Sequence, residues 1–71
     1  MTLHQYLVHT DVRIACCVLG IRQRMVWALR SYERRPSQDL LLRAADAIPG
    51  LDVEATIREY ADADERRAPR P

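Results

Sequence analysis

Apolar side chains recur at intervals of three and four residues along most of the chain, and no long stretch alternates between apolar and polar. Intervals of three and four keep side chains on one face of an α-helix, whereas strands need alternation. The pattern therefore predicts an all-α fold of five short helices, over residues 3–9, 11–18, 22–32, 37–47 and 52–61. The expected inward-facing residues are Leu3, Tyr6, Leu7, Val12, Ala15, Cys16, Leu19, Met25, Val26, Leu29, Tyr32, Leu40, Leu41, Ala44, Val53, Ile57 and Tyr60, with Ala47 or Ile48 completing the fourth stripe.

Capping and turn residues separate the expected helices. Thr2, followed three positions later by Gln5, matches a capping box at the start of the first helix. Gly20 suits a left-handed backbone position between the second and third helices. Pro36 disfavours helical backbone before it, and Ser37 can cap the fourth helix. These signals place each boundary within a few residues.

The periodic pattern stops after Ala61, where the chain becomes charged and contains prolines. Residues 1–61 are therefore predicted to form a single domain, and residues 62–71 a disordered charged tail. No apolar run approaches the roughly 20 residues that span a bilayer, and the first residues do not resemble a signal peptide. We expect no membrane partner and a cytoplasmic location.

The expected third helix has two different faces. At about 100° per residue, Met25, Val26 and Leu29 fall on one arc. The opposite arc carries Gln23, Arg24, Trp27, Arg30 and Ser31. An exposed tryptophan leaves a large apolar area in water, which usually indicates a binding partner. The polar arc therefore predicts an interaction surface, with nucleic acid and protein both open as partners.

Charge is distributed unevenly along the chain. Residues 11–43 hold seven arginines against three acidic residues, a net charge of +4, and residues 44–65 hold seven acidic residues against one arginine, a net charge of −6. All eleven basic residues are arginine, a bias that a GC-rich genome would also produce. Arginine is the better bidentate partner for phosphate and guanine. A basic middle beside an acidic C-terminal part therefore indicates a face for nucleic acid.

No arrangement typical of catalysis or metal binding is evident in the sequence. His4 and His9 are five positions apart on the expected first helix, do not share a face, and are expected to be ordinary solvated side chains. Cys16 and Cys17 are adjacent, where a disulfide would be strained, and no second cysteine pair completes a zinc site. We therefore expect no enzyme, and no catalytic, cofactor-binding or metal-binding residues.

The segment from Val12 to Pro36 resembles the helix-turn-helix of Cro and phage-repressor-type regulators. The likeness is carried by Cys16, Gly20, Ile21, Val26 and Leu29, which follow the family's order of small, glycine, aliphatic, branched and apolar positions, and by Arg34, Pro36 and Ser37. The opening residues, MTLHQYL, resemble the first helix of the small Cro-like and YdaS-like members. The likeness covers about residues 3–60 and implies a five-helix, Cro/repressor-like DNA-binding domain.

The chain departs from this family pattern at several positions. Tyr32 stands where the family often has glycine, so we expect a lengthened third helix. Trp27 stands where the family usually carries a small polar residue that faces the bases. Asp11 stands where a neutral residue commonly touches a phosphate, which a carboxylate would repel. These departures leave the identity of the bound partner open.

The resemblance implies that the third helix enters the major groove of operator DNA, and that the chain regulates transcription as a homodimer on a two-fold operator. The expected base contacts are Arg22, Gln23, Arg24, Trp27 and Ser31, and the expected phosphate contacts are Arg13, Arg30, Arg34 and Arg35. Arginine pairs with guanine and glutamine with adenine, whereas phosphate contacts set register.

A second interpretation gives the same face a protein partner. Tryptophan and arginine are the residues that most often dominate protein interfaces. The basic face around Trp27 would then bind an acidic patch on RNA polymerase or another transcription protein. Both interpretations end in the control of transcription, and they differ in which molecule the third helix contacts.

Overall fold

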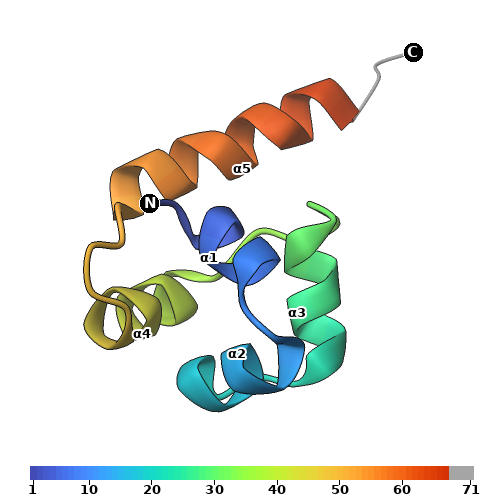
Figure 1. The fold of residues 1–71 in the computed structure, drawn as a ribbon. Coiled ribbons are helices and arrows are strands. Elements are labelled where there is room, and N and C mark those ends of the chain that lie inside the picture. The colour runs from blue at the N-terminus through green and yellow to red at the C-terminus, as the bar shows by residue number, and fades with distance from the viewer. Residues whose placement is uncertain (68–71) are drawn as a thin grey trace.

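The computed structural model describes residues 1–67, which form five α-helices and no strand (Figure 1). The helices are α1 (Leu3–His9), α2 (Val12–Leu19), α3 (Gln23–Arg30), α4 (Gln38–Ala47) and α5 (Val53–Arg67). The expectation of an all-α fold of five helices is confirmed for this part of the chain. None of the five combines the length and the hydropathy that crossing a bilayer requires.

One core joins all five helices. In Figure 1, α5 crosses one end of the molecule and α2 lies at the other, with α1 between them. Helix α2 packs on α3 and α4, whereas α1 packs on α3 and α5. The buried cluster consists of Leu3, Leu7, Ala15, Leu19, Val26, Leu29, Leu40, Ala44, Ile48 and Tyr60. Each of these was expected to face inward, and Ile48 rather than the exposed Ala47 completes the stripe of α4.

The capping box expected at Thr2 and Gln5 is formed, and a second side chain caps α2. The Gln5 backbone amide donates to Thr2 Oγ1 at 3.2 Å, and the Thr2 amide donates to Gln5 Oε1 at 3.0 Å, which completes the capping box. Asp11 Oδ1 accepts from the Arg13 amide at 2.8 Å at the start of α2. Such side-chain acceptors satisfy first-turn amides that have no partner within the helix.

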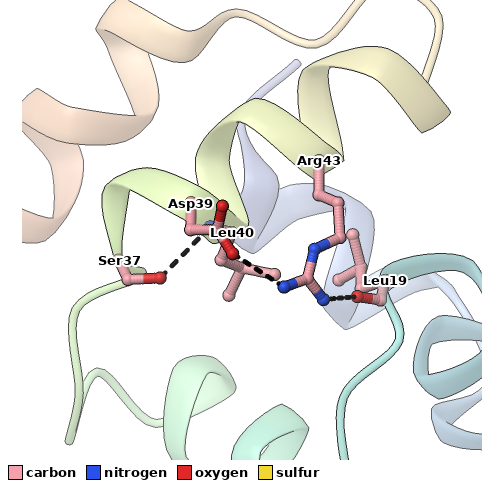
Figure 2. Close-up of polar contacts among 5 residues, drawn as sticks. All are labelled: Leu19, Ser37, Asp39, Leu40 and Arg43. Carbon is pink, nitrogen blue, oxygen red and sulfur yellow. Dashed lines mark hydrogen bonds and ion pairs between the residues drawn. The ribbon is translucent and has the colours of Figure 1, made fainter.

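The turn between α2 and α3 depends on Gly20. Its φ of 67° and ψ of 36° lie in the left-handed region, as expected, and its amide donates to the Cys16 carbonyl at 2.8 Å. Arg43 of α4 spans this turn, as Figure 2 shows: Nη1 donates to the Leu19 carbonyl at 3.0 Å, and Nη2 to Asp39 Oδ2 at 2.9 Å. A Cβ on residue 20 would lie 3.3 Å from that Nη1. Gly20 therefore allows both the backbone turn and the close approach of the arginine.

Helix α3 is shorter than expected, and the prediction that the missing glycine lengthens it is wrong. The helix ends at Arg30, and Tyr32 itself adopts the left-handed conformation, with a φ of 62°. The Glu33 amide then donates to the Ala28 carbonyl at 2.9 Å, which closes the end of the helix. A tyrosine rarely adopts this conformation, so contacts of its side chain must offset the strain.

Helix α5 is longer than expected. The prediction of a disordered tail is wrong for residues 62–67, which continue the helix, and residues 68–71 lie outside the described part of the chain. Arg66 Nη2 pairs with Asp62 Oδ2 one turn earlier at 2.6 Å. Asp64 forms an ion pair with Arg35. Alanines and ion pairs at a spacing of four favour helix, so charge here stabilises the element instead of ending it.

The inward face of α5 also differs from the expectation. Ile57 is 51% exposed, and Thr56 is fully buried. Thr56 Oγ1 accepts from the Leu3 amide at 2.9 Å and donates to the Asp52 carbonyl at 2.8 Å. The first turn of α1 needs an acceptor where it meets α5, because a buried amide without a partner is destabilising. The inward face of α5 therefore carries the hydroxyl of Thr56, whereas the apolar pattern predicted the side chain of Ile57 there.

We predict that Gly20→Ala lowers the free energy of unfolding by about 1–2 kcal/mol, because a Cβ disfavours the left-handed backbone and crowds Arg43. Urea denaturation followed by circular dichroism measures the loss. Gly50→Ala is the matched control, since Gly50 has a φ of 80° but a Cβ added there would meet nothing within 4 Å. If Gly50→Ala lowered the free energy of unfolding as much as Gly20→Ala or more, the contact with Arg43 would not explain the loss at Gly20.

Candidate nucleic-acid interface

The exposed side of α3 carries most of the residues expected to contact bases. Val26 and Leu29 are fully buried and fix the rotation of the helix about its axis. Gln23, Arg24 and Ser31 are exposed, and Trp27 is 55% exposed. Arg22 precedes the helix as its N-cap and is also exposed. The expectation that the tryptophan lies on the outer face is therefore confirmed.

The N-terminal end of α3 is open and positive. Arg22 forms no side-chain hydrogen bond as the N-cap, and its carbonyl accepts from the Met25 and Val26 amides. The amides of Gln23 and Arg24 precede these bonded positions, and first-turn amides have no acceptor within their own helix. The helix dipole adds partial positive charge at this end. This end of α3 therefore favours an anionic group.

A hollow of about 550 Å³ lies beside this end of the helix. Its lining consists of Ile21, Arg22, Gln23, Arg24, Met25, Ala28 and Arg34. Arg34 reaches the hollow because the left-handed Tyr32 turns the chain back along α3, and the Arg34 amide donates to the Ala28 carbonyl at 3.4 Å. The lining therefore combines apolar side chains with three arginines, which suits a ligand that is both apolar and anionic.

Trp27 and Arg30 form a pair on the surface of α3. The guanidinium carbon of Arg30 lies 4.8 Å from the centroid of the indole ring, within the range of a cation–π contact. Arg30 is half-buried, and Trp27 keeps more than half of its area exposed. The pair therefore presents a flat apolar ring beside a positive charge.

Two of the expected contact residues are engaged elsewhere. The Ser31 hydroxyl donates to the Trp27 carbonyl at 3.0 Å and lies 3.2 Å from the Ala28 carbonyl, so its proton is committed to the end of α3. Arg35 forms its ion pair with Asp64 on α5 instead of lying free beside α3. Asp64 therefore balances the charge of Arg35, which the sequence analysis expected to contact a phosphate.

The arginines whose side chains the structure describes divide into two groups. Arg35, Arg43, Arg58 and Arg66 each pair with an acidic residue. Arg13, Arg22, Arg24, Arg30 and Arg34 form no ion pair with any described residue. The unpaired group comes from α2, α3 and the turns that flank α3, whereas the acidic residues of the chain concentrate on α5. Helices α2 and α3 and the turns that flank α3 therefore carry five arginines that no ion pair with a described residue neutralises.

An aromatic cluster of His4, Tyr32 and Tyr60 holds the other end of α3. The His4 and Tyr32 rings stack with centroids 4.2 Å apart, and the Tyr32 and Tyr60 rings meet edge to face at 5.2 Å. His4 Nε2–H donates to the Arg30 carbonyl at 2.9 Å, and the Tyr60 hydroxyl donates to the Leu29 carbonyl at 2.8 Å. The expectation that His4 is merely solvated is wrong, since α1 and α5 use it and Tyr60 to position α3.

The cluster extends to one carboxylate. The Tyr32 hydroxyl donates to Glu59 Oε2 at 3.2 Å, and the buried Glu59 Oε1 has no hydrogen-bond partner among the described residues. Burial raises the pKa of Tyr32 above its usual value, and the Glu59 charge raises it further. Burial is also the main reason why the pKa of Tyr60 is strongly raised. Both hydroxyls are therefore neutral hydrogen-bond donors at neutral pH.

The cysteines and histidines do not assemble into a site. Cys16 is half-buried and Cys17 exposed, and both are free thiols. Among residues 1–67, no group of three or more His, Cys, Asp and Glu side chains could hold a metal ion.

We predict that Tyr60→Phe lowers the free energy of unfolding by about 1 kcal/mol, because it removes the hydroxyl donor from the buried Leu29 carbonyl, which keeps the longer hydrogen bond from the Tyr32 amide at 3.3 Å. The free energy of unfolding is also expected to fall at alkaline pH. Since the folded-state pKa values of Tyr32 and Tyr60 are raised, their protonated forms stabilise the fold fully below the unfolded value of about 10. That contribution is lost as the pH rises above this value.

Urea denaturation between neutral pH and about pH 11 measures both effects. Tyr6→Phe is the control, because the half-buried Tyr6 hydroxyl forms no hydrogen bond with a described residue. A Tyr60→Phe chain as stable as the wild type, with the same alkaline loss, would contradict the role of this hydroxyl.

Comparison with known proteins identifies no family for this chain. No family model, curated protein or solved structure matches it. A functional conclusion therefore depends on the surface of α3 and on the chemistry of its side chains.

Proposed function

We propose that this chain is a small transcription regulator that binds operator DNA, with α2, the Gly20 turn and α3 acting as a helix-turn-helix of the Cro and phage-repressor type. The observation that carries the proposal is the group of five arginines without ion pairs, Arg13, Arg22, Arg24, Arg30 and Arg34, on and around α3. Guanidinium groups without an acidic partner in the chain are available to phosphates and to base edges.

In this proposal α3 lies in the major groove. A helix of eight residues is about 12 Å long, and with side chains it is about as wide as the groove. Arg22, Gln23 and Arg24 at the leading end face the bases, since arginine pairs with guanine and glutamine with adenine. Trp27 contacts a thymine methyl or a sugar edge from the same exposed side.

Phosphates bind the remaining free arginines. Arg34 lines the same hollow as Arg24, and Arg13 is exposed on α2, so both are available to phosphates. Arg35 makes no direct contact in this arrangement, because Asp64 neutralises it. The acidic α5 disfavours the opposite orientation of the domain, since its carboxylates would meet the phosphates.

A second candidate function is the binding of a transcription protein, such as RNA polymerase, through the same side. One observation favours it: Trp27 is 55% exposed and pairs with Arg30. A flat indole with a neighbouring guanidinium is the combination most often found at the energetic centre of a protein interface. The partner would then present an acidic rim around an apolar pocket.

We predict different effects for two arginines on the binding of a duplex selected from a random pool. Arg24→Ala should reduce discrimination at one base pair by about 1–3 kcal/mol, because it removes a base contact. Arg34→Ala should weaken all sequences alike and flatten the slope of log affinity against log salt by about one unit. Gel shifts over a range of salt measure both quantities.

Arg58→Ala is the matched control for this experiment. It removes the same charge from α5, where Arg58 pairs with Glu54, and should leave binding nearly unchanged. If a folded wild-type chain shifts no duplex at low salt, the DNA proposal fails and the protein-binding candidate replaces it.

Trp27 separates the two candidates. Because the indole is 55% exposed, we predict red-shifted emission in the free chain and ready quenching by iodide. With DNA as the partner, the selected duplex quenches the emission and Trp27→Ala weakens binding modestly. With a protein as the partner, RNA polymerase being the one assayed, Trp27→Ala costs about 2 kcal/mol or more. Blue-shifted emission that resists iodide would contradict the exposure itself.

A further inference from the structure

The hollow of about 550 Å³ beside α3 is lined in part by apolar side chains to which the proposed DNA contacts give no role. Met25 and Ala28 lie three positions apart on α3 and therefore share one side of the helix, and Ile21 precedes them in the turn from α2. Ile21 and Met25 pack against the core, yet all three side chains stay only half-buried. Apolar area that the core does not cover therefore faces this hollow.

The same hollow is positively charged. Arg22 and Arg24 line it from the leading end of α3, and Arg34 lines it from the chain that follows the helix. None of the three forms an ion pair with a described residue, and no described acidic residue lines the hollow. Guanidinium groups bind carboxylates through two parallel hydrogen bonds. An anionic group in the hollow can therefore bind arginines from two separate segments of the chain.

The combination of apolar and charged lining restricts the class of ligand. A duplex satisfies the arginines, but in the major groove only the thymine methyl group offers an apolar contact. An inorganic anion also leaves the apolar side chains in water, and an uncharged apolar molecule leaves the arginines without an anion. An organic anion with an apolar body satisfies both parts of the lining.

We propose that this hollow binds a small organic anion, a monocarboxylate with an apolar body, and that the bound anion excludes DNA from α3. The carboxylate accepts hydrogen bonds from Arg24 and Arg34, and the apolar body covers Met25 and Ala28. The volume of about 550 Å³ lies within the range of roughly 300–1,000 Å³ that is usual for small-molecule sites, which combine apolar lining with a few polar groups.

The exclusion of DNA rests on the proposed function, whereas the binding of the anion does not. In the proposed complex Arg24 contacts a base and Arg34 a phosphate, and both line the hollow. A carboxylate bound to these guanidinium groups occupies the donors that the duplex needs, so the two ligands compete. The site therefore links the release of operator DNA to the concentration of an organic acid.

Titration of the full chain with hexanoate at neutral pH and without DNA tests the site, with the chemical shifts of the backbone amides as the measurement. We expect saturable changes at Ile21, Met25 and Ala28. Acetate carries the same charge without the apolar chain, and 1-hexanol has the chain without the charge, so each should bind about tenfold or more weakly than hexanoate. Equal binding of acetate or 1-hexanol overturns the proposal, as do changes confined to other parts of the chain.

Arg34→Gln should weaken the binding of hexanoate by about tenfold, because glutamine retains a hydrogen-bond donor but removes the charge. Arg58→Gln is the matched control, since Arg58 pairs with Glu54 on α5 and does not line the hollow, and its affinity for hexanoate should equal that of the wild type. Circular dichroism confirms that the helices are retained in both variants. Unchanged affinity in Arg34→Gln overturns the site.

Gel shifts with the selected duplex and saturating hexanoate then test the exclusion of DNA. Hexanoate is expected to release the duplex from the wild type. A chain that binds hexanoate but shifts no duplex supports the site and removes the proposed DNA binding, whereas a chain that shifts duplexes and binds no hexanoate does the reverse. Simultaneous binding of both ligands overturns the exclusion.

Discussion

The position of α3 depends on how its C-terminal carbonyls are satisfied. A helix of eight residues is marginal by itself, and its last carbonyls need partners from outside. His4 from α1 and the Tyr60 hydroxyl from α5 donate to the Arg30 and Leu29 carbonyls, so α1 and α5 meet at the end of one short helix. The stacked ring of Tyr32 lies between these donors. These contacts hold the C-terminal end of α3, whereas the burial of Val26 and Leu29 sets the rotation of the helix about its axis.

The apolar periodicity of the sequence was sufficient to predict the rotation of α3 about its axis. When Val26 and Leu29 are buried, helical geometry alone places Trp27 on the outer face. Gly20 was equally predictable, since a left-handed position between two helices favours glycine. The left-handed Tyr32 was not predictable from local pattern. Its strain is offset by rings that lie 28 residues away on either side, at His4 and Tyr60, and no local rule records such contacts.

The candidate site shows the same division between local and distant causes. Ion pairs at a spacing of four, such as that of Asp62 with Arg66, can be inferred from sequence, and attention to them would have extended α5. The pair between Arg35 and Asp64 joins residues 29 positions apart, so the sequence could not show that Arg35 is neutralised. The sequence shows that each of these residues is an arginine, but only the tertiary structure shows which of them form no ion pair with a described residue.

Because both α1 and α5 donate hydrogen bonds to the end of α3, the order in which the helices are synthesised has a consequence. As the chain leaves the ribosome, α2 and α3 emerge before Tyr60 does, and until then the Leu29 carbonyl has no tyrosine to bind. Of the two side chains from α1 and α5 that donate to the end of α3, only His4 is then present, and Tyr32 has one aromatic neighbour instead of two. A nascent chain therefore displays its arginines on an incompletely anchored helix. Release of the finished domain, with α5 in place, is the step that gives the surface of α3 its final shape.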